Sequence, residues 1–515
     1  MKNERIVGII CVALLISVFA PIIPNALAKD GKTLVVGTSD RLEEISPTNC
    51  YDYYTWHVFF ETCEGLVDYK PGTVELVPKL AESWDVSEDG TVYTFYLRKG
   101  VTFTDGEPFN AQAMKWSMDR AFKLDGPKGA VFLIKDIVEK VEVIDDYTVR
   151  FTLKAPDADF LARMTNPPAF PLSPKSTPKN DFARGRFAGT GPYILADYTP
   201  DVRLVYEAYA NYWGPKPKST KVIEVLYRDA TALRLAIETG EVDVAYRTFE
   251  PTDILDLKKN PNLRVLEGPT LSIRYNVFNA QMAPFDDVLV RQAIAAAVDR
   301  EAIVSQVFSG LNDPLYSMVP PGLWSHLDVC EPRNLTKAQE LLKEAGYSEK
   351  NPLKITLWFT PEHYGTTESS VAVVEAKSLE ETGMIKVSIE SLEWAEYAER
   401  QAEGLLGFFL LGWYPDFISP DNFLSPFIST SGGQVLGAHF SDLGVDTALS
   451  AARVTEDPAI RTELYEALQK IDAELVITLP LWSNKAQVYA VAKPNVHGVV
   501  LDLTSRFRTE LIWKE

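Results

Sequence analysis

Short apolar runs alternate with amphipathic segments along most of this chain. Helices are expected where apolar residues recur at helical spacing, namely at 53–60, 111–122, 231–240, 288–298, 337–345, 369–381, 394–403 and 457–475. Strands are expected from apolar or alternating runs at 33–37, 91–98, 101–104, 137–144, 148–153, 222–227, 242–245, 272–278, 353–359, 386–389 and 407–413. Asp52 and Asn110 are placed to cap the helices that follow them. This alternation predicts an α/β fold, with a parallel crossover over 222–245.

The N-terminus has the pattern of an export signal. Lys2 and Arg5 precede an apolar run over 6–20, and Ala26-Leu27-Ala28 provides a small-residue cleavage site. The run is short for a membrane span, which needs about 20 apolar residues. Extended to Ile23 it becomes long enough that an uncleaved anchor stays open as an alternative. Export to the periplasm or the cell surface is therefore expected, with 1–28 as the signal peptide.

The length and the charge exclude some classes of protein. A chain of 515 residues is too long for one compact core, so several domains are expected. Its formal net charge of −20 argues against nucleic acid as a partner, because phosphates demand a basic surface. No complete phosphate-loop, dinucleotide, zinc or nucleophile-elbow motif occurs, so no enzyme activity, cofactor or metal is predicted.

Two stretches are almost fully specified in the same way as a known family. They are Leu80–Phe122, which contains the turn Asp-Gly-Glu-Pro before a helix, and Phe409–Phe423, which reads FLLGWYPDFISPDNF. Further matching blocks are GTGPY at 189–193, NYWGPKP at 211–217, AIETGEVDV at 236–244, PFDDVLVRQAIAAAVDREA at 284–302, VPPG at 319–322 and AQELLKEAGY at 338–347. In this order over most of the chain, they resemble the family 5 extracellular solute-binding proteins, the peptide/nickel class that serves ABC transporters.

The resemblance implies a two-lobed, hinge-closing fold of the periplasmic-binding-protein type (type II). Lobe 1 would span 29–270 and carry an inserted subdomain at about 75–198. Lobe 2 would span 271–495, and residues 496–515 would return to lobe 1. A protein of this kind closes on its ligand as a monomer and presents it to permease subunits in the membrane.

The same resemblance implies which residues meet the ligand. In peptide-binding relatives, an acidic residue three positions after the Trp of the second stretch pairs with the ligand's α-ammonium group, and here that residue is Asp416. Trp413, Tyr414 and Phe417 would lie beside it, and Tyr53 and Tyr54 would approach from lobe 1.

The opposite end of the ligand is less well specified. Relatives often supply an Arg to the ligand's carboxylate from a proline-led segment, but the matching segment here, Pro361–Gly365, holds none. His363, if protonated, and Tyr364 are the candidates in this segment. The expected cargo is a di- or oligopeptide. The alternatives are an oligosaccharide or a nickel chelate bound by the same fold, and, from another class, a secreted hydrolase.

Overall fold

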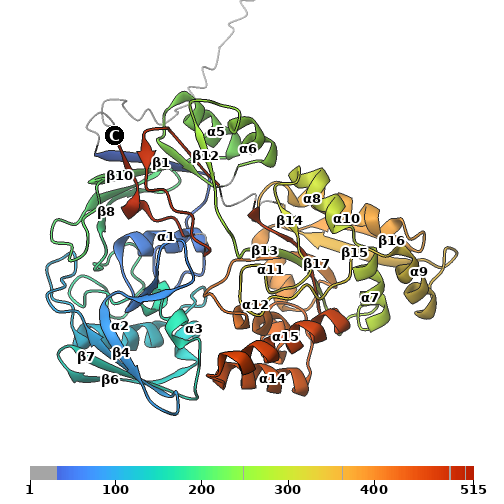
Figure 1. Ribbon diagram of the computed structural model, residues 1–515, viewed down its shortest axis with the longest axis horizontal. Coiled ribbons are helices and arrows are strands. Elements are labelled where there is room, and N and C mark those ends of the chain that lie inside the picture. The colour runs from blue at the N-terminus through green and yellow to red at the C-terminus, as the bar shows by residue number, and fades with distance from the viewer. Residues whose placement is uncertain (1–31, 248, 362, 486–488, 505) are drawn as a thin grey trace, which may run out of the picture.

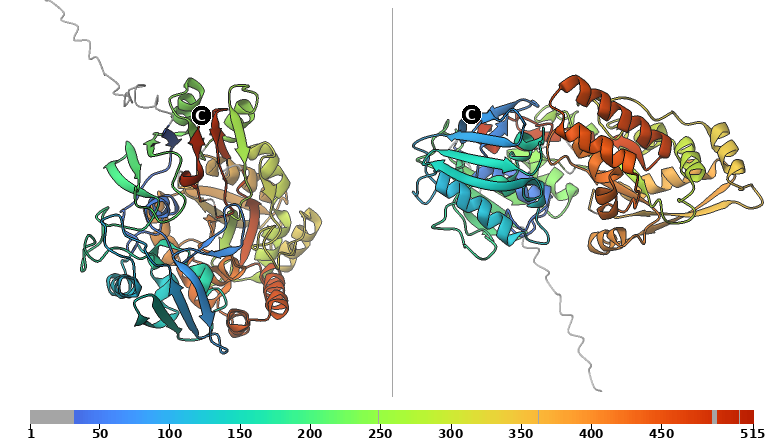
Figure 2. Two further views of the ribbon diagram at one scale, coloured as in Figure 1. Left: turned by 60° about the vertical axis from the view of Figure 1, so that its left-hand side comes forward. Right: turned by 90° about the horizontal axis from the view of Figure 1, so that it is seen from below.

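The computed structural model describes residues 32–247, 249–361, 363–485, 489–504 and 506–515, which form two lobes lying side by side (Figures 1 and 2). The predicted signal segment 1–28 lies outside the described residues. None of the helices within these ranges combines the length and the apolar character that crossing a bilayer requires.

Lobe 1 is built on a sheet that, within the described residues, has seven strands in the order β12-β19-β11-β1-β10-β9-β8. Strand β1 (Thr33–Thr38) runs parallel to both β10 (Lys221–Leu226) and β11 (Val244–Tyr246). Helix α5 (Ala230–Thr239) joins these two neighbours, so the predicted crossover is confirmed. The other strands of the sheet pair antiparallel with their neighbours: β8 (Tyr193–Thr199), β9 (Arg203–Ala208), β12 (Arg264–Glu267) and β19 (Tyr489–Ala492).

Helix α1 (Tyr53–Thr62) packs into the core of this lobe. The side chain of Asp52 accepts a hydrogen bond from the amide of Thr55 at 2.7 Å, as expected of a helix N-cap. The smaller elements of the lobe are β2 (Val67–Tyr69), β3 (Leu76–Pro78), α3 (Phe132–Lys135), α4 (Phe160–Arg163), a 3₁₀ turn (Pro167–Ala169) and α6 (Pro251–Leu257).

A four-stranded antiparallel sheet forms a separate layer at the lower edge of lobe 1 (Figure 1). Its order is β4-β5-β7-β6, with β4 at Ala81–Val86, β5 at Val92–Leu97, β6 at Val138–Asp145 and β7 at Thr148–Leu153. Helix α2 (Ala111–Leu124) packs against β6 and β7, and Asn110 caps it by accepting from the amide of Ala113 at 2.9 Å.

The strand expected at 101–104 is wrong. Within it only Thr102 pairs, with Pro108, in an isolated bridge. The tight turn at Gly106, where φ is 87°, brings these two residues together across a span too short to build a ladder.

Lobe 2 is a mixed sheet in the order β14-β18-β13-β17-β15-β16. The strands are β13 (Ile273–Phe278), β14 (Asp313–Pro314), β15 (Leu353–Phe359), β16 (Ile385–Ser391), β17 (Phe408–Trp413) and β18 (Thr478–Ser483). Strand β17 is buried on both faces: Phe408 and Leu410 join one hydrophobic cluster, and Phe409 and Leu411 join another. Burial on both faces explains its unbroken apolar sequence.

Helices cover both faces of this sheet (Figure 2). One hydrophobic cluster contains residues of α7 (Val288–Ala297), α8 (Arg300–Phe308), α9 (Leu335–Glu344) and α10 (Glu368–Glu380). The other contains residues of α11 (Trp394–Ala402), α12 (Asp421–Ile428), α14 (Leu443–Val454) and α15 (Pro458–Leu475), and α13 (Thr430–Val435) follows α12. The predicted helices of this half are confirmed to within a few residues at each end.

The chain returns to lobe 1 earlier than expected. The sequence-based boundary placed 271–495 in lobe 2, but β19 pairs with β11 and β12 of the lobe 1 sheet. The reason is strand pairing: Tyr489–Ala492 is an apolar strand that lies between β11 and β12 and pairs with both. The last residues add β20 (Val496–His497), a 3₁₀ turn (Thr509–Leu511) and β21 (Trp513–Lys514).

Buried ion pairs hold this C-terminal segment in lobe 1. Arg508 is buried and contacts Asp502 at 2.5 Å and Asp68 at 3.2 Å, and Arg506 reaches Asp68 at 2.7 Å. Burial acts to raise the pKa of Asp68, but the charges of Arg506 and Arg508 outweigh it and lower that pKa to about 2. The contribution of Asp68 to stability is therefore present above about pH 4 and is lost as the pH falls through about 2.

We expect Arg508→Met to lower the free energy of unfolding by about 3–5 kcal/mol, because it removes the arginine that pairs with buried Asp502 and leaves Asp68 with Arg506 alone. Thermal and urea unfolding at pH 7 measure this. The matched control is Arg186→Met, which removes an exposed arginine that lies 3.7 Å from Asp181 and should cost about 1 kcal/mol or less. Equal losses in the two variants would contradict the anchoring role.

Candidate functional site

The loop between β17 and α12 carries the sequence-predicted acidic residue to the face between the lobes. Asn422, near the start of α12, fixes its shape. The amide of Asp416 and the indole Nε1 of Trp413 donate to Asn422 Oδ1 at 2.9 and 3.2 Å, and Asn422 Nδ2 donates to Asp416 Oδ2 at 3.0 Å. This reciprocal bonding sets the direction of the Asp416 side chain.

Asp416 meets lobe 1 through Tyr51. The Tyr51 hydroxyl donates to Asp416 Oδ1 at 2.8 Å. Asp416 is only 8% exposed, whereas Tyr51 is 41% exposed, so the buried carboxylate is hydrogen-bonded to a residue that is partly open to solvent. Burial raises the pKa of Asp416 to about 6, against the opposing effect of the hydrogen bonds from Asn422 and Tyr51.

Three more of the predicted residues gather around this point. Tyr53 from α1 and Tyr414 from lobe 2 stack at 5.5 Å between ring centroids. The guanidinium of Arg247 lies 5.2 Å from the ring of Tyr53 and 5.6 Å from that of Tyr414. Asp40 holds this guanidinium with two contacts, at 2.6 and 2.7 Å. Trp413, the third predicted residue, is half-buried where β17 ends.

The segment 361–365 packs beside the same loop. The Tyr364 hydroxyl donates to the carbonyl oxygen of Gly412 at 3.3 Å. The ring of His363 lies parallel to Trp394 at 3.7 Å. Loss of hydration in this stack, followed by the positive charge of Arg274, lowers the pKa of His363 to about 4. His363 is therefore neutral at pH 7, and the protonated role expected for it is not supported.

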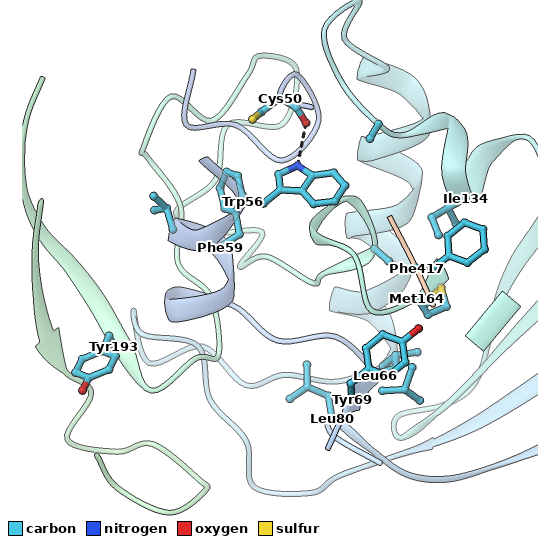
Figure 3. Packing of buried hydrophobic residues seen from close by; sticks show 14 of the residues in the cluster. Cys50, Trp56, Phe59, Leu66, Tyr69, Leu80, Ile134, Met164, Tyr193 and Phe417 are labelled. Atoms are coloured by element: carbon cyan, nitrogen blue, oxygen red, sulfur yellow. Dashed lines mark hydrogen bonds between the residues drawn. The ribbon is translucent and has the colours of Figure 1, made fainter. Parts of the chain in front are cut away.

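Two of the predicted ligand contacts, Tyr54 and Phe417, lie in the hydrophobic core. Tyr54 is 3% exposed, because it lies on the face of α1 that packs into the core, where it stacks on His57. Phe417 is 1% exposed and belongs to the hydrophobic core of lobe 1, although its own strand and helix belong to lobe 2. Figure 3 shows Phe417 among the lobe 1 side chains of Ile134, Met164 and Tyr69.

Sequence reasoning missed Tyr51, Arg247 and Arg274. Arg274 lies on β13, with its guanidinium 3.9 Å from the centroid of the Tyr364 ring, and it is 1% exposed. It forms an ion pair with Glu368 through Nη2, while Nε and Nη1 have no hydrogen-bond partner among the described residues. No signal in the sequence marked it, since an arginine in an alternating strand is normally solvent-facing.

Within the described residues, His, Cys, Asp and Glu side chains form no group of three or more that is suited to a metal ion. Around this loop the structure places the buried carboxylate of Asp416, two buried guanidinium groups that are each paired with a carboxylate, and several aromatic rings.

Comparison with known proteins adds independent information. Residues 75–434 match the profile described as bacterial extracellular solute-binding proteins, family 5 Middle. The chain is 32% identical over 461 residues to heme-binding protein A of Haemophilus influenzae, covering 84% of this chain and 83% of that protein. It is 31% identical over 468 residues to the dipeptide-binding protein of Escherichia coli, covering 85% and 86%.

A solved structure shows the same architecture. The periplasmic binding protein of Helicobacter pylori in complex with the peptide STSA superposes with a TM-score of 0.82 at 28% sequence identity, covering 94% of this chain and 98% of that one.

Proposed function

Because the chain belongs to the bacterial extracellular solute-binding proteins of family 5, we propose that it captures short peptides between its lobes and delivers them to the permease of an ABC importer. The peptide-binding relatives and the STSA complex support this cargo. It would act as a monomer outside the cytoplasmic membrane, in the periplasm or at the cell surface. We place lobe 1 at 29–270 with its subdomain at about 75–198, lobe 2 from 271, and the return to lobe 1 before Tyr489.

One observation carries the ligand assignment: the carboxylate of Asp416 is buried between the lobes without a cation at ion-pair distance among the described residues. Its partners are the neutral groups of Tyr51 and Asn422. A buried carboxylate without a counter-ion costs several kcal/mol, and its raised pKa reflects that cost. A ligand ammonium would supply the missing positive charge. It would lose its hydration but would donate charge-assisted hydrogen bonds to the carboxylate of Asp416.

The aromatic residues fit the rest of a short peptide. Tyr53 and Tyr414 stack on each other from opposite lobes and would offer their ring faces once the lobes part, and Tyr364 contacts the backbone at Gly412. Such rings would also suit the alternative cargo of an oligosaccharide. A neutral sugar, however, would leave the buried charge of Asp416 uncompensated, so the carboxylate favours a cationic group.

Arg274 is our candidate for the opposite end of the peptide. Two of its donors are buried without a partner, and buried polar groups are normally satisfied. Arg274 lies on β13, but its guanidinium is next to Tyr364. Tyr364 belongs to the segment in which relatives often carry their arginine. A carboxylate or a backbone carbonyl of the ligand would satisfy these donors once the Tyr364 ring turns aside.

We expect Asp416→Asn to weaken binding of the dipeptide Ala-Phe by about 2–4 kcal/mol, or roughly 30- to 1000-fold, because the amide offers no charge to the ammonium. Isothermal calorimetry at pH 7 measures the change. N-acetyl-Ala-Phe is the matched ligand: it lacks the ammonium, so it should bind the wild-type protein and the variant with similar, weak affinity. Unchanged affinity for Ala-Phe would reject the amine-anchor role.

Binding should also depend on pH with a defined sign. The ammonium needs an ionised Asp416, whose pKa in the free protein is about 6. The affinity for Ala-Phe should hold steady near pH 7 and fall by about tenfold per pH unit below about pH 6. Tyr51→Phe removes a hydrogen bond that lowers this pKa, so the fall should begin at a higher pH. A similar fall in Asp416→Asn would assign the effect to another group.

The role of Arg274 is tested with the C-terminal amide of Ala-Phe. Amidation should weaken binding to the wild-type protein by about tenfold or more, because it removes the ligand's carboxylate. In the double variant Arg274→Met/Glu368→Gln, which leaves no buried charge behind, the acid and the amide should bind equally. Glu368→Gln alone is the control and should keep the preference. A preference that survives in the double variant would exclude Arg274.

A further inference from the structure

A second set of charged side chains joins the lobes away from Asp416, and we call it the interlobe charge cluster. Lobe 1 contributes side chains from α4 and the residues just before it, and lobe 2 contributes side chains from α12, α14 and α15. The members are Asp157, Asp159 and Arg163 from lobe 1, and Asp421, Arg453 and Arg461 from lobe 2.

Direct contacts cross between the lobes in this cluster. Arg461 Nη2 lies 2.9 Å from Asp159 Oδ1, and the hydroxyl of Ser419 donates to Asp159 Oδ2 at 2.8 Å. Arg163 Nη2 lies 3.6 Å from Asp421 Oδ2. The backbone joins in as well, since the amide of residue 158 donates to the carbonyl oxygen of residue 453 at 3.0 Å.

Contacts within each lobe support these crossings. Asp157 lies 3.2 Å from Arg163 Nε on the lobe 1 side, and Asp421 lies 3.0 Å from Arg453 Nε on the lobe 2 side. Four of the six residues are less than one-tenth exposed, so the charges are removed from water when the lobes meet.

A buried aromatic ring completes the junction. Phe417 enters the core of lobe 1, and the guanidinium of Arg163 lies over it at 4.4 Å. The amide of the next residue, Ile418, donates to the hydroxyl of Tyr69 at 3.0 Å. Phe417, Ile418, Ser419 and Asp421 thus contact lobe 1 directly, through groups of the protein itself.

The division of charge between the two sides determines what the cluster does. The lobe 1 side carries two carboxylates and one guanidinium, and the lobe 2 side carries one carboxylate and two guanidiniums. Each side alone therefore has a net formal charge, and the two are opposite in sign. Opening the lobes would separate Asp159 from Arg461 and Arg163 from Asp421, leaving partly buried charges to be hydrated on both faces.

We propose that the interlobe charge cluster, together with Phe417, is a latch that holds the lobes closed in the absence of ligand. The latch sets the fraction of closed protein before any ligand arrives, and the apparent affinity for ligand scales with that fraction. Because every contact in it is made within the protein, the latch does not depend on which molecule Asp416 binds.

Small-angle X-ray scattering of the full-length, ligand-free protein tests the latch directly. Wild type at low salt should give the radius of gyration of the closed form. Arg461→Gln, and separately Asp159→Asn, should shift it upward, because each removes the shortest interlobe ion pair. The charge swap Asp159→Arg/Arg461→Asp should bring it back toward the wild-type value, since the pair is restored with reversed polarity.

Matched controls separate the latch from general charge effects. Arg400→Gln removes the same charge from lobe 2 and should leave the radius of gyration unchanged, because the ion-pair partner of Arg400 among the described residues is Glu396 of the same helix, at 2.6 Å. Circular dichroism confirms that each variant is folded. If Arg461→Gln and Asp159→Asn both keep the wild-type radius of gyration, the latch does not exist. An increase in Arg400→Gln equal to that in Arg461→Gln would overturn it too. Neither result tests whether Asp416 pairs with the ammonium of a ligand, which the binding experiments above decide separately.

Discussion

The segment between β17 and α12 has to satisfy both lobes at once, and most of the interface depends on it. Near the start of the segment, Asp416 is held by hydrogen bonds with Asn422 of α12, so that its carboxylate points toward Tyr51. At its end, Phe417 and Ser419 are already bound to lobe 1. A single short loop therefore carries both the proposed ligand anchor and the proposed latch, and a shift in one moves the other.

Buried charges at this interface are of two kinds. Asp159 and Asp421 are compensated by arginines within the protein, whereas Asp416 has only neutral hydrogen-bond partners among the described residues. Burial without a counter-ion explains why the pKa of Asp416 is raised to about 6. The energetic role differs accordingly: the compensated charges favour the closed arrangement by themselves, whereas the uncompensated charge of Asp416 opposes that arrangement until a cation enters.

Most of the fold could be predicted from the sequence, because hydrophobic periodicity and capping residues act locally. The crossover from β10 through α5 to β11 and the caps at Asp52 and Asn110 are examples. The position of β19 could not be predicted in the same way. Its partners, β11 and β12, are more than two hundred residues away, and nothing local to Tyr489–Ala492 indicates which sheet it completes.

For the candidate site, too, local sequence signals could be used for the prediction, whereas contacts between distant parts of the chain could not. Asp416 and Tyr414 were predicted from the motif, and Tyr53 from the place where relatives bring lobe 1 residues to the ligand. The structure brings Tyr53 and Tyr414 together. The burial of Tyr54 and Phe417 could not be predicted, because neighbouring aromatic residues look alike in sequence, while the face of a helix and the depth of a loop decide which of them is buried. Arg274 escaped notice because its importance lies in two donors that lack partners, which only a three-dimensional arrangement shows.

Closure and binding are linked by the balance between these two kinds of charge. A ligand shifts the equilibrium between open and closed forms only through its differential affinity for the closed one. If the latch already favours closure, little of the ligand's interaction with Asp416 is needed to bring the lobes together, and more of it appears as affinity. A latch that was too strong would instead slow the opening that release to a permease requires. The composition of the cluster suits an intermediate strength. Its two sides have opposite net charge and attract each other across the interface. When the lobes part, one ion pair remains within each lobe, Asp157 with Arg163 and Asp421 with Arg453.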